Sequence, residues 1–87
     1  EEIESAANSI DYINESSALH GYINNNSRIY LVLSINIEVE SAVIKNDLRK
    51  IIPEYMIPSK VIIMKMLPKN ANGKIDRNIL KKNMELL

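Results

Sequence analysis

A lysine at the tip of a turn is the residue of this sequence that is best placed to do chemistry. Lys74 directly follows Asn72-Gly73, one of the strongest short turn signals that a sequence can contain. A two-residue turn of type I′ needs a positive φ at both central residues, which Asn and Gly tolerate best. We expect this turn to hold the Lys74 ammonium at a rigid corner, where it could meet an anion. Such turns are also common as plain solvated loops, so the turn alone assigns no function.

The segments around this turn resemble a signature known from one enzyme superfamily. Pro53-Glu54-Tyr55-Met56-Ile57-Pro58 is followed by an apolar stretch, by Leu67-Pro68, and then by Asn72-Gly73-Lys74-Ile75-Asp76-Arg77 and Leu80. In this order and at this spacing, the segments resemble the C-terminal subdomain of the adenylate-forming enzymes. That superfamily contains the adenylation domains of nonribosomal peptide synthetases, the D-alanyl carrier protein ligases and the acyl-CoA synthetases.

The resemblance implies a catalytic role for the lysine. In this superfamily, the lysine at the position of Lys74 enters the active site and serves adenylation, in which a carboxylate and ATP form an acyl-AMP and pyrophosphate. A positioned ammonium suits this reaction because charge builds up on the oxygens of the transferring phosphoryl group. By the same resemblance, Asn72 and Gly73 shape the turn that supports the lysine, and Asp76 and Arg77 cap and orient the following helix.

A second face is implied for a later step of the reaction. Glu2-Ile3-Glu4 resembles the segment that begins the first helix of the subdomain. In the superfamily this subdomain acts as a lid that rotates between two half-reactions. Glu2, Ile3 and Glu4 are therefore candidates for the face used in thioester transfer. The acceptor would be the phosphopantetheine arm of an acyl or peptidyl carrier protein, or CoA. Residues 55–58 and 72–77 resemble more closely the amino-acid-activating branch that loads carrier proteins.

The length of the chain limits what it can do alone. Its 87 residues allow one small domain, and they contain no Gly-rich phosphate-binding loop. The superfamily places ATP, Mg²⁺ and substrate recognition on a larger N-terminal domain. We therefore predict that residues 1–87 are a single C-terminal lid subdomain, inactive alone, whose partner is an N-terminal adenylation subdomain. The competing hypothesis is a stand-alone, non-catalytic interaction module with the same fold.

Composition argues against several other classes of protein. The chain has no cysteine and one histidine, which disfavours disulfides and a metal site. Its net charge is zero, and its four tyrosines lie in no basic, aromatic-rich motif, so a nucleic-acid partner is not expected. No apolar run approaches about 18 residues and no signal peptide is visible. We therefore expect a cytoplasmic protein without a membrane partner.

Charge is divided unevenly between the two halves of the chain. Residues 1–40 carry seven acidic residues and one basic residue, whereas residues 41–87 carry ten basic and four acidic residues. The C-terminal half is therefore a candidate anion-facing end. Five of its basic side chains are interpreted instead as solvated helix faces: Lys45, Arg49, Lys50, Lys81 and Lys82.

The pattern of apolar residues predicts the elements that position the lysine. The expected fold class is α+β, a small three-stranded sheet with helices packed on it, in the order α-β-β-α-β-turn-α. Helices are expected at residues 1–14, 42–52 and 77–86. Strands are expected at residues 16–23, 28–37 and 60–67, with a turn at 24–27. The last helix is expected to bury Ile79 or Leu80 together with Met84 and Leu87.

Individual residues support these boundaries. Ser41 and Asp76 are predicted N-caps of the second and third helices, and Pro53 is expected to end the second. The strand at 60–67 is apolar at nearly every position, which favours a central place in the sheet. Tyr55 lies in a connector between two prolines, where we expect its ring to pack and its hydroxyl to stay in water.

Overall fold

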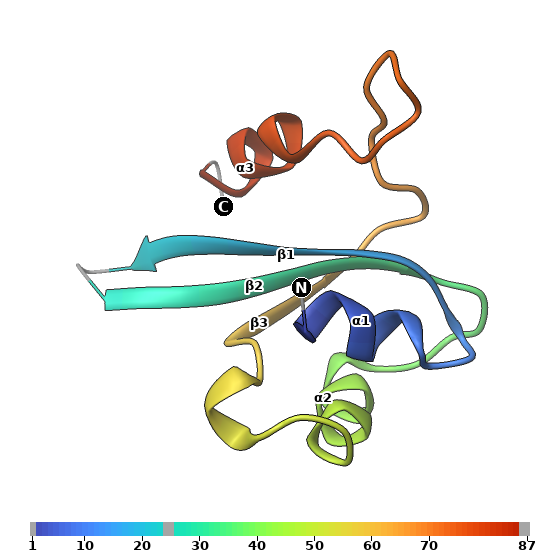
Figure 1. Ribbon diagram of the computed structural model, residues 1–87, viewed down its shortest axis with the longest axis vertical. Helices are drawn as coiled ribbons and strands as arrows, with labels where there is room; N and C mark the ends of the chain where they lie inside the picture. The colour runs from blue at the N-terminus through green and yellow to red at the C-terminus, as the bar shows by residue number, and fades with distance from the viewer. Residues whose placement is uncertain (1, 24–25, 86–87) are drawn as a thin grey trace.

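The computed structural model describes residues 2–23 and 26–85, and its elements follow the predicted α+β order with one short 3-10 helix added. The elements are α1 (Glu2–Asn8), β1 (Ile13–Ile23), β2 (Asn26–Ile35), α2 (Ser41–Arg49), η1 (Glu54–Met56), β3 (Lys60–Ile63) and α3 (Arg77–Glu85). They form three layers, with α1 and α2 on one face of the sheet and α3 on the other (Figure 1).

β2 is the central strand of the three-stranded sheet, whose order is β1-β2-β3. β1 and β2 pair antiparallel, with Ala18 opposite Leu31, whereas β2 and β3 pair in parallel, with Val32 opposite Ile62. Parallel neighbours need a crossover connection, which α2 provides between these two strands. The strand predicted at 60–67 is therefore a four-residue edge strand, and its predicted central place is wrong.

The apolar pattern of residues 60–67 has two causes. Val61 packs against the helices on one face of the sheet and Ile62 against the other layer, so even an edge strand between two layers is apolar on both sides. After Ile63 the chain leaves the sheet, and Leu67 is fully buried under α3 rather than in a strand. A continuous apolar run does not distinguish a strand from a strand followed by a packed loop.

Each face of the sheet carries its own hydrophobic cluster. Alternation along β2 sends Leu31 and Leu33 to one side and Val32 to the other. Core 1, on the side of α1 and α2, comprises Ile3, Ala6, Ala7, Ile13, Ala18, Leu31, Leu33, Ile44, Leu48 and Ile52. Core 2, on the side of α3, comprises Leu19, Val32, Leu67 and Leu80. Core 2 therefore fastens both ends of the segment that carries the predicted lysine.

α1 is shorter than the helix predicted at 1–14 because the chain turns after Asn8. The Ser9 hydroxyl donates to the Ala6 carbonyl oxygen at 2.7 Å, so the side chain competes for a backbone group at the helix end. The residues from Ile13 onward begin β1 instead of continuing the helix. The helical spacing of apolar residues continues past Asn8 only because Ile13, the first residue of β1, is also buried.

β1 and β2 extend further toward their N-terminal ends than the predicted strands. β1 begins at Ile13, and β2 runs from Asn26 to Ile35, two residues short of the predicted end at 37. Asn26 and Ser27 of the predicted turn belong to β2. Residues 24 and 25 of that turn lie outside the described part of the chain.

Ser41 is the first residue of α2 and not its N-cap, so this prediction is wrong. Glu40 holds the N-cap in an extended conformation (φ −83°, ψ 155°), without a side-chain capping bond to any described residue. Its carbonyl oxygen accepts the Val43 N–H at 3.0 Å, so the backbone of Glu40 already starts the helix. α2 ends at Arg49, well before Pro53, so the proline is not what stops it.

The prediction for the Tyr55 ring is wrong, whereas the predicted N-cap of α3 is confirmed. Tyr55 is 82% exposed, because η1 turns its ring outward while Met56 packs on core 1, so the predicted packing of this ring is wrong. In α3 the predicted N-cap is confirmed, since Asp76 Oδ1 accepts the Ile79 N–H at 3.1 Å. Leu80, and not Ile79, is the buried alternative. The side chain of Met84 and residue Leu87 lie outside what the structure describes.

Candidate functional site

Residues 67–77, which we call the lysine corner, form a short antiparallel excursion on the side of the sheet that carries α3 (Figure 1). Its two arms meet in a β-bridge between Lys69 and Ile75. The Asp76 N–H donates to the Pro68 carbonyl oxygen at 2.8 Å, which closes the base of the corner. The corner is therefore a hydrogen-bonded unit and not an open loop.

The tip of the corner turns over Ala71 and Asn72. The Gly73 N–H donates to the Asn70 carbonyl oxygen at 3.0 Å, which closes a four-residue turn from Asn70 to Gly73. Gly73 itself lies in the left-handed region with φ +79°, as in a type I turn followed by a G1 bulge. The prediction of a type I′ turn centred on Asn72 and Gly73 is wrong, although Gly73 has the positive φ that was its basis.

Asn70 is a residue of this site that the predicted two-residue turn did not include. Its Oδ1 accepts the N–H of Asn72 at 2.9 Å and the N–H of Lys74 at 3.1 Å. The side chain thereby fixes the backbone from which the lysine leaves the corner. An Asn three positions before a Gly is the signal that indicates such a turn, because Asn side chains bond the backbone two residues on.

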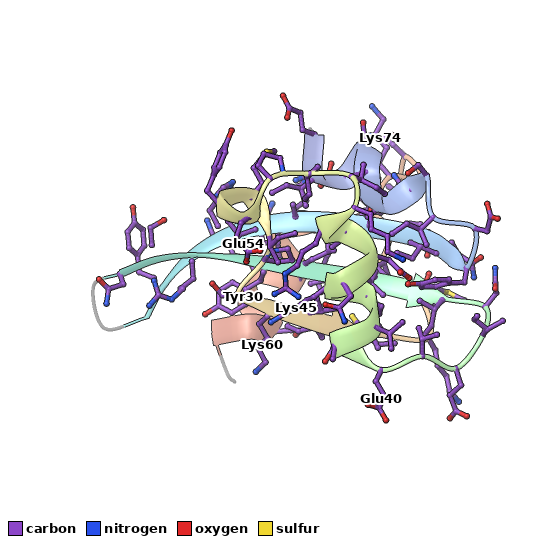
Figure 2. All side chains as sticks on the ribbon, turned by 90° about the horizontal axis from the view of Figure 1, so that it is seen from below. Tyr30, Glu40, Lys45, Glu54, Lys60 and Lys74 are labelled. Atoms are coloured by element: carbon purple, nitrogen blue, oxygen red, sulfur yellow. The ribbon has the colours of Figure 1, made fainter. Side chains whose placement is uncertain are left out.

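Lys74 stands at the exposed end of the corner. In Figure 2 its side chain lies at the outer edge of the molecule. Within residues 2–23 and 26–85, its ammonium takes part in no hydrogen bond or ion pair. A compact cation held at a fixed point with all its donors free can bind an anion that arrives from outside the domain.

Lys69 anchors the first arm of the corner to β1. Its ammonium forms an ion pair with the Glu15 carboxylate and donates to the Leu67 carbonyl oxygen at 3.1 Å. The Lys69 and Glu15 side chains are 34% and 27% exposed, so both are mostly shielded from water. The hydrogen bond from Lys69 holds the pKa of Glu15 below its ordinary value of 4.5. The Glu15 carboxyl group is therefore ionised at neutral pH.

Arg77 anchors the second arm to α1. Its Nη2 donates to both carboxylate oxygens of Glu4, at 3.0 and 2.8 Å, and its Nη1 donates to the Ala18 carbonyl oxygen at 3.3 Å. Of the two residues predicted to cap and orient α3, Asp76 makes the cap. Arg77 instead crosses the free edge of β1 and links the layer of α3 to the layer of α1.

The predicted second face is only partly open to solvent. Ile3 is 7% exposed and belongs to core 1, and the Glu4 side chain is 14% exposed because Arg77 and the Ala18 N–H occupy it. Glu2 is exposed and, with Ile3 and Arg77, lines a groove of about 460 Å³. The structure thus joins Glu4 to the lysine corner, whereas it turns Ile3 inward.

Both anchors join an acidic residue of the N-terminal half to a basic residue of the C-terminal half. The segregation of charge in the sequence carries this signal, since residues 1–40 are acidic and residues 41–87 basic. Lys69 and Arg77 bind within the domain, so the basic excess of the C-terminal half is in part internal. The exposed Lys74 is not part of either anchor.

The described residues contain neither a membrane span nor a metal cluster. No helix in residues 2–23 and 26–85 is both long and apolar enough to cross a bilayer. The same stretches bring no three His, Cys, Asp or Glu side chains into a group that could hold a metal ion. No described residue is therefore assigned to Mg²⁺.

Comparison with known proteins identifies the family. The AMP-binding enzyme C-terminal domain family matches residues 2–74. A D-alanine–D-alanyl carrier protein ligase from Staphylococcus haemolyticus is 37% identical over 85 residues, which cover 88% of this chain and 17% of the ligase. The chain therefore spans less than a fifth of the length of that relative.

Two solved structures share the fold. A four-domain nonribosomal peptide synthetase, AB3403, bound to AMP and glycine, is 31% identical with a TM-score of 0.79, over 88% of this chain and 6% of that one. A fatty acyl CoA synthetase from Mycobacterium tuberculosis has a TM-score of 0.85 over 94% of this chain and 17% of its own, and its 23% identity supports the fold alone. This chain belongs to the AMP-binding enzyme C-terminal domain family of the adenylate-forming enzymes.

Proposed function

We propose that this chain is the mobile C-terminal lid of an amino-acid-activating adenylation enzyme, and that Lys74 is its catalytic lysine. The observation that carries the proposal is the exposed Lys74 ammonium, free of partners among the described residues, at the end of a corner that is anchored on both arms. Membership of the family supports the kind of enzyme, and the name of the carrier protein ligase supports the branch.

Adenylation explains why a lid would present a free ammonium. An oxygen of the substrate carboxylate attacks the α-phosphorus of ATP, and the bond from that phosphorus to pyrophosphate breaks. The attacking group and the phosphate chain are both anions, and negative charge grows on the oxygens between them. Lys74 would contact the carboxylate and the nucleotide and stabilise this charge, an effect that typically changes a rate by about 100- to 1000-fold.

The remaining components of the reaction would come from outside this chain. ATP and Mg²⁺ would be held mainly by an N-terminal adenylation subdomain, which would also select the substrate. After adenylation, rotation of the lid would present the Glu2-Ile3-Glu4 face for thioester transfer to the phosphopantetheine arm of an acyl or peptidyl carrier protein. The 87 residues alone would then be inactive, because they supply the lysine but no nucleotide site.

Exposed apolar side chains beside the corner support docking on a larger domain. Met66, just before the corner, is 72% exposed, and Ile79, just after it, is 44% exposed. Large apolar groups that lie in water near a functional residue commonly mark an interaction surface. A lid that closes over an active site would bury them.

Pyrophosphate exchange into ATP tests the proposal. The full-length protein that contains this domain is assayed over a panel of amino acids, together with Lys74→Ala and with Lys82→Ala, an exposed lysine on α3 that serves as the matched control. We expect one amino acid to support exchange, Lys74→Ala to lower it by about 100- to 1000-fold, and Lys82→Ala to leave it unchanged. Unchanged exchange by Lys74→Ala would refute the catalytic role.

The acceptor is tested separately, because an acyl-CoA synthetase lid is the alternative. The full-length enzyme is loaded with its amino acid and ATP and is offered either a carrier protein bearing phosphopantetheine or free CoA. The proposal predicts thioester on the carrier protein. Faster formation of acyl-CoA would assign the domain to the acyl-CoA branch while leaving the role of Lys74 intact.

A further inference from the structure

The two ion pairs of the lysine corner are placed at its two ends. Lys69 lies one residue before the four-residue turn and is paired with Glu15 of β1. Arg77 is the first residue of α3 and is paired with Glu4 of α1. Lys74 lies between these anchors, so the position of its backbone depends on both of them. Neither anchor involves the Lys74 side chain.

The Arg77 anchor uses the free edge of the sheet. β1 is an edge strand, and the backbone of Ala18 would otherwise leave a donor and an acceptor unpaired at that edge. Glu4 Oε2 accepts the Ala18 N–H at 2.8 Å, and Arg77 Nη1 donates to the Ala18 carbonyl oxygen at 3.3 Å. The two-pronged contact between Arg77 and Glu4 closes this unit. Arg77 is thereby held by three acceptors, the two carboxylate oxygens of Glu4 and the Ala18 carbonyl oxygen.

The Lys69 anchor holds the corner against Glu15, three residues before Ala18 on the same strand. Glu15 lies opposite Ser34 in the sheet and accepts a hydrogen bond from the Ser34 hydroxyl at 3.4 Å, so its carboxylate is oriented before Lys69 reaches it. Leu67, two residues before Lys69, is fully buried in core 2. The first arm is therefore held at two nearby positions, by the burial of Leu67 and by the ion pair of Lys69 with Glu15.

Stability alone does not account for two anchors at this place. Ion pairs with shielded charges add little net free energy of folding, because the cost of removing both charges from water offsets much of their attraction. Their geometric effect is larger, since together they prevent the tip from swinging about its base. Catalysis by a charged group depends on its place, and a displacement of about 1 Å can cost about 100-fold in rate.

We propose that Glu15–Lys69 and Glu4–Arg77 are positioning pairs that set where Lys74 stands, so that Glu15, Lys69 and Arg77 affect adenylation through the lysine without touching substrate. This inference rests on the proposed function. It assigns a role in the reaction to residues 15 and 69, whose hydrogen bonds and ion pairs within the described part of the chain do not include Glu2, Ile3 or Glu4. The Glu15–Lys69 pair is therefore the better one to test.

The test uses the full-length enzyme with Lys69→Met, Glu15→Gln, and the reversed pair Glu15→Lys with Lys69→Glu. The control is Glu54→Gln, which removes the exposed Arg49–Glu54 ion pair of 3.1 Å, away from the corner. Two rates are measured for each protein: formation of the acyl-adenylate, and thioester formation from adenylate supplied in advance. Thermal unfolding confirms that each variant is folded.

We expect the two single variants to lower kcat of adenylate formation by about 10- to 100-fold, with little change in KM for ATP and with normal thioester formation. The reversed pair should recover most of the lost rate, because it restores the attraction with the charges exchanged. Glu54→Gln should behave as the wild type. Arg77→Lys, which keeps the charge but lacks the second nitrogen that bonds the Ala18 carbonyl oxygen, should also slow adenylation.

Two results would overturn the inference. One is a Lys69→Met or Glu15→Gln enzyme with a normal rate of adenylation, and the other is an equal loss in both half-reactions without rescue by the reversed pair, which indicates a structural role only. Lys74→Ala, assayed in parallel, separates this failure from that of the proposed function. If Lys74→Ala is inactive in adenylation while the Lys69 and Glu15 variants are normal, the function stands and the positioning role falls.

Discussion

Asn70 fixes the tip of the lysine corner with a side chain that bonds two backbone N–H groups. Its Oδ1 reaches the N–H of Asn72 and the N–H of Lys74, while its own carbonyl oxygen accepts from Gly73. Asn72 lies at the centre of the same turn, where its N–H is the donor. Two asparagines two positions apart therefore have unequal roles in the geometry of the lysine.

This inequality predicts a difference between two alanine variants. Asn70→Ala leaves two N–H groups to water and should lower the free energy of unfolding by about 1 kcal/mol, while it slows adenylation by loosening the lysine. Asn72→Ala removes no side-chain acceptor of the corner and should change both quantities less. Chemical denaturation and adenylate formation, measured for both variants, check this. Equal effects of the two substitutions would contradict the assigned role of Asn70.

Tyr12 gives a prediction about alkaline pH. Its hydroxyl donates to Asp47 Oδ2 at 2.6 Å, and burial, followed by this hydrogen bond and the charge of Asp47, raises the pKa of Tyr12 from 10.0 to about 12. Because the folded pKa lies above the unfolded one, the stabilisation is complete below pH 10 and is lost as the pH rises toward 12.

Tyr12→Phe should therefore lower the free energy of unfolding by about 1 kcal/mol at neutral pH and flatten its decline above pH 10. Urea unfolding on either side of that pH measures both effects. Tyr55→Phe is the control, because the Tyr55 ring is 82% exposed. An unchanged alkaline decline in Tyr12→Phe would show that this hydroxyl does not carry the effect.

At the scale of the elements, helix positions followed from local patterns, and sheet order did not. An amphipathic stripe and an N-cap such as Asp76 each depend on only a few residues that are close together in the sequence. Whether a strand is central depends on which other strands pair with it, and β2 takes that place by pairing with both β1 and β3. The end of α1 could not be predicted either. The Ser9 hydroxyl bonds a backbone carbonyl oxygen at the end of the helix, and Ile13 is buried from a strand although its spacing also fits a helix.

α3 allows a direct test of core 2. Leu80 is 1% exposed and packs with Leu67, whereas its neighbour Ile79 is 44% exposed. Leu80→Ala should lower the free energy of unfolding by about 2–5 kcal/mol, because a buried leucine leaves both lost burial and a cavity. Ile79→Ala should cost much less. Thermal or urea unfolding of the two variants decides, and a similar loss in both would mean that α3 packs on another face.

At the scale of the whole molecule, the exposed position of Lys74 beside a turn could be predicted from the sequence, whereas the ion pairs that anchor the turn could not. Lys74 and Gly73 lie in one short segment that resembles the family pattern. The contact between Glu4 and Arg77 joins residues 73 positions apart, so only the three-layer arrangement brings them together. The charge segregation between the halves of the chain predicted an anion-facing end and did not reveal these internal ion pairs.

The proposed function requires one small domain to serve two steps, and the three layers give it two separate faces (Figure 1). The Glu2-Ile3-Glu4 segment lies on the face of α1, the lysine corner lies on the face of α3, and Arg77 joins them across the edge of β1 (Figure 1). A rigid body of this kind can present one face and then the other by rotating as a whole. Movement of the domain, rather than a change within it, would then separate the two half-reactions.

The measurement that tests this division of labour most directly is single-turnover kinetics of the full-length enzyme with Lys74→Ala. Acyl-adenylate formation from ATP and the cognate amino acid is timed first, and thioester formation from supplied adenylate is timed separately. We predict that adenylate formation falls by about 100- to 1000-fold while thioester formation stays close to the wild-type rate. Adenylate formation at the wild-type rate would contradict the catalytic role of Lys74.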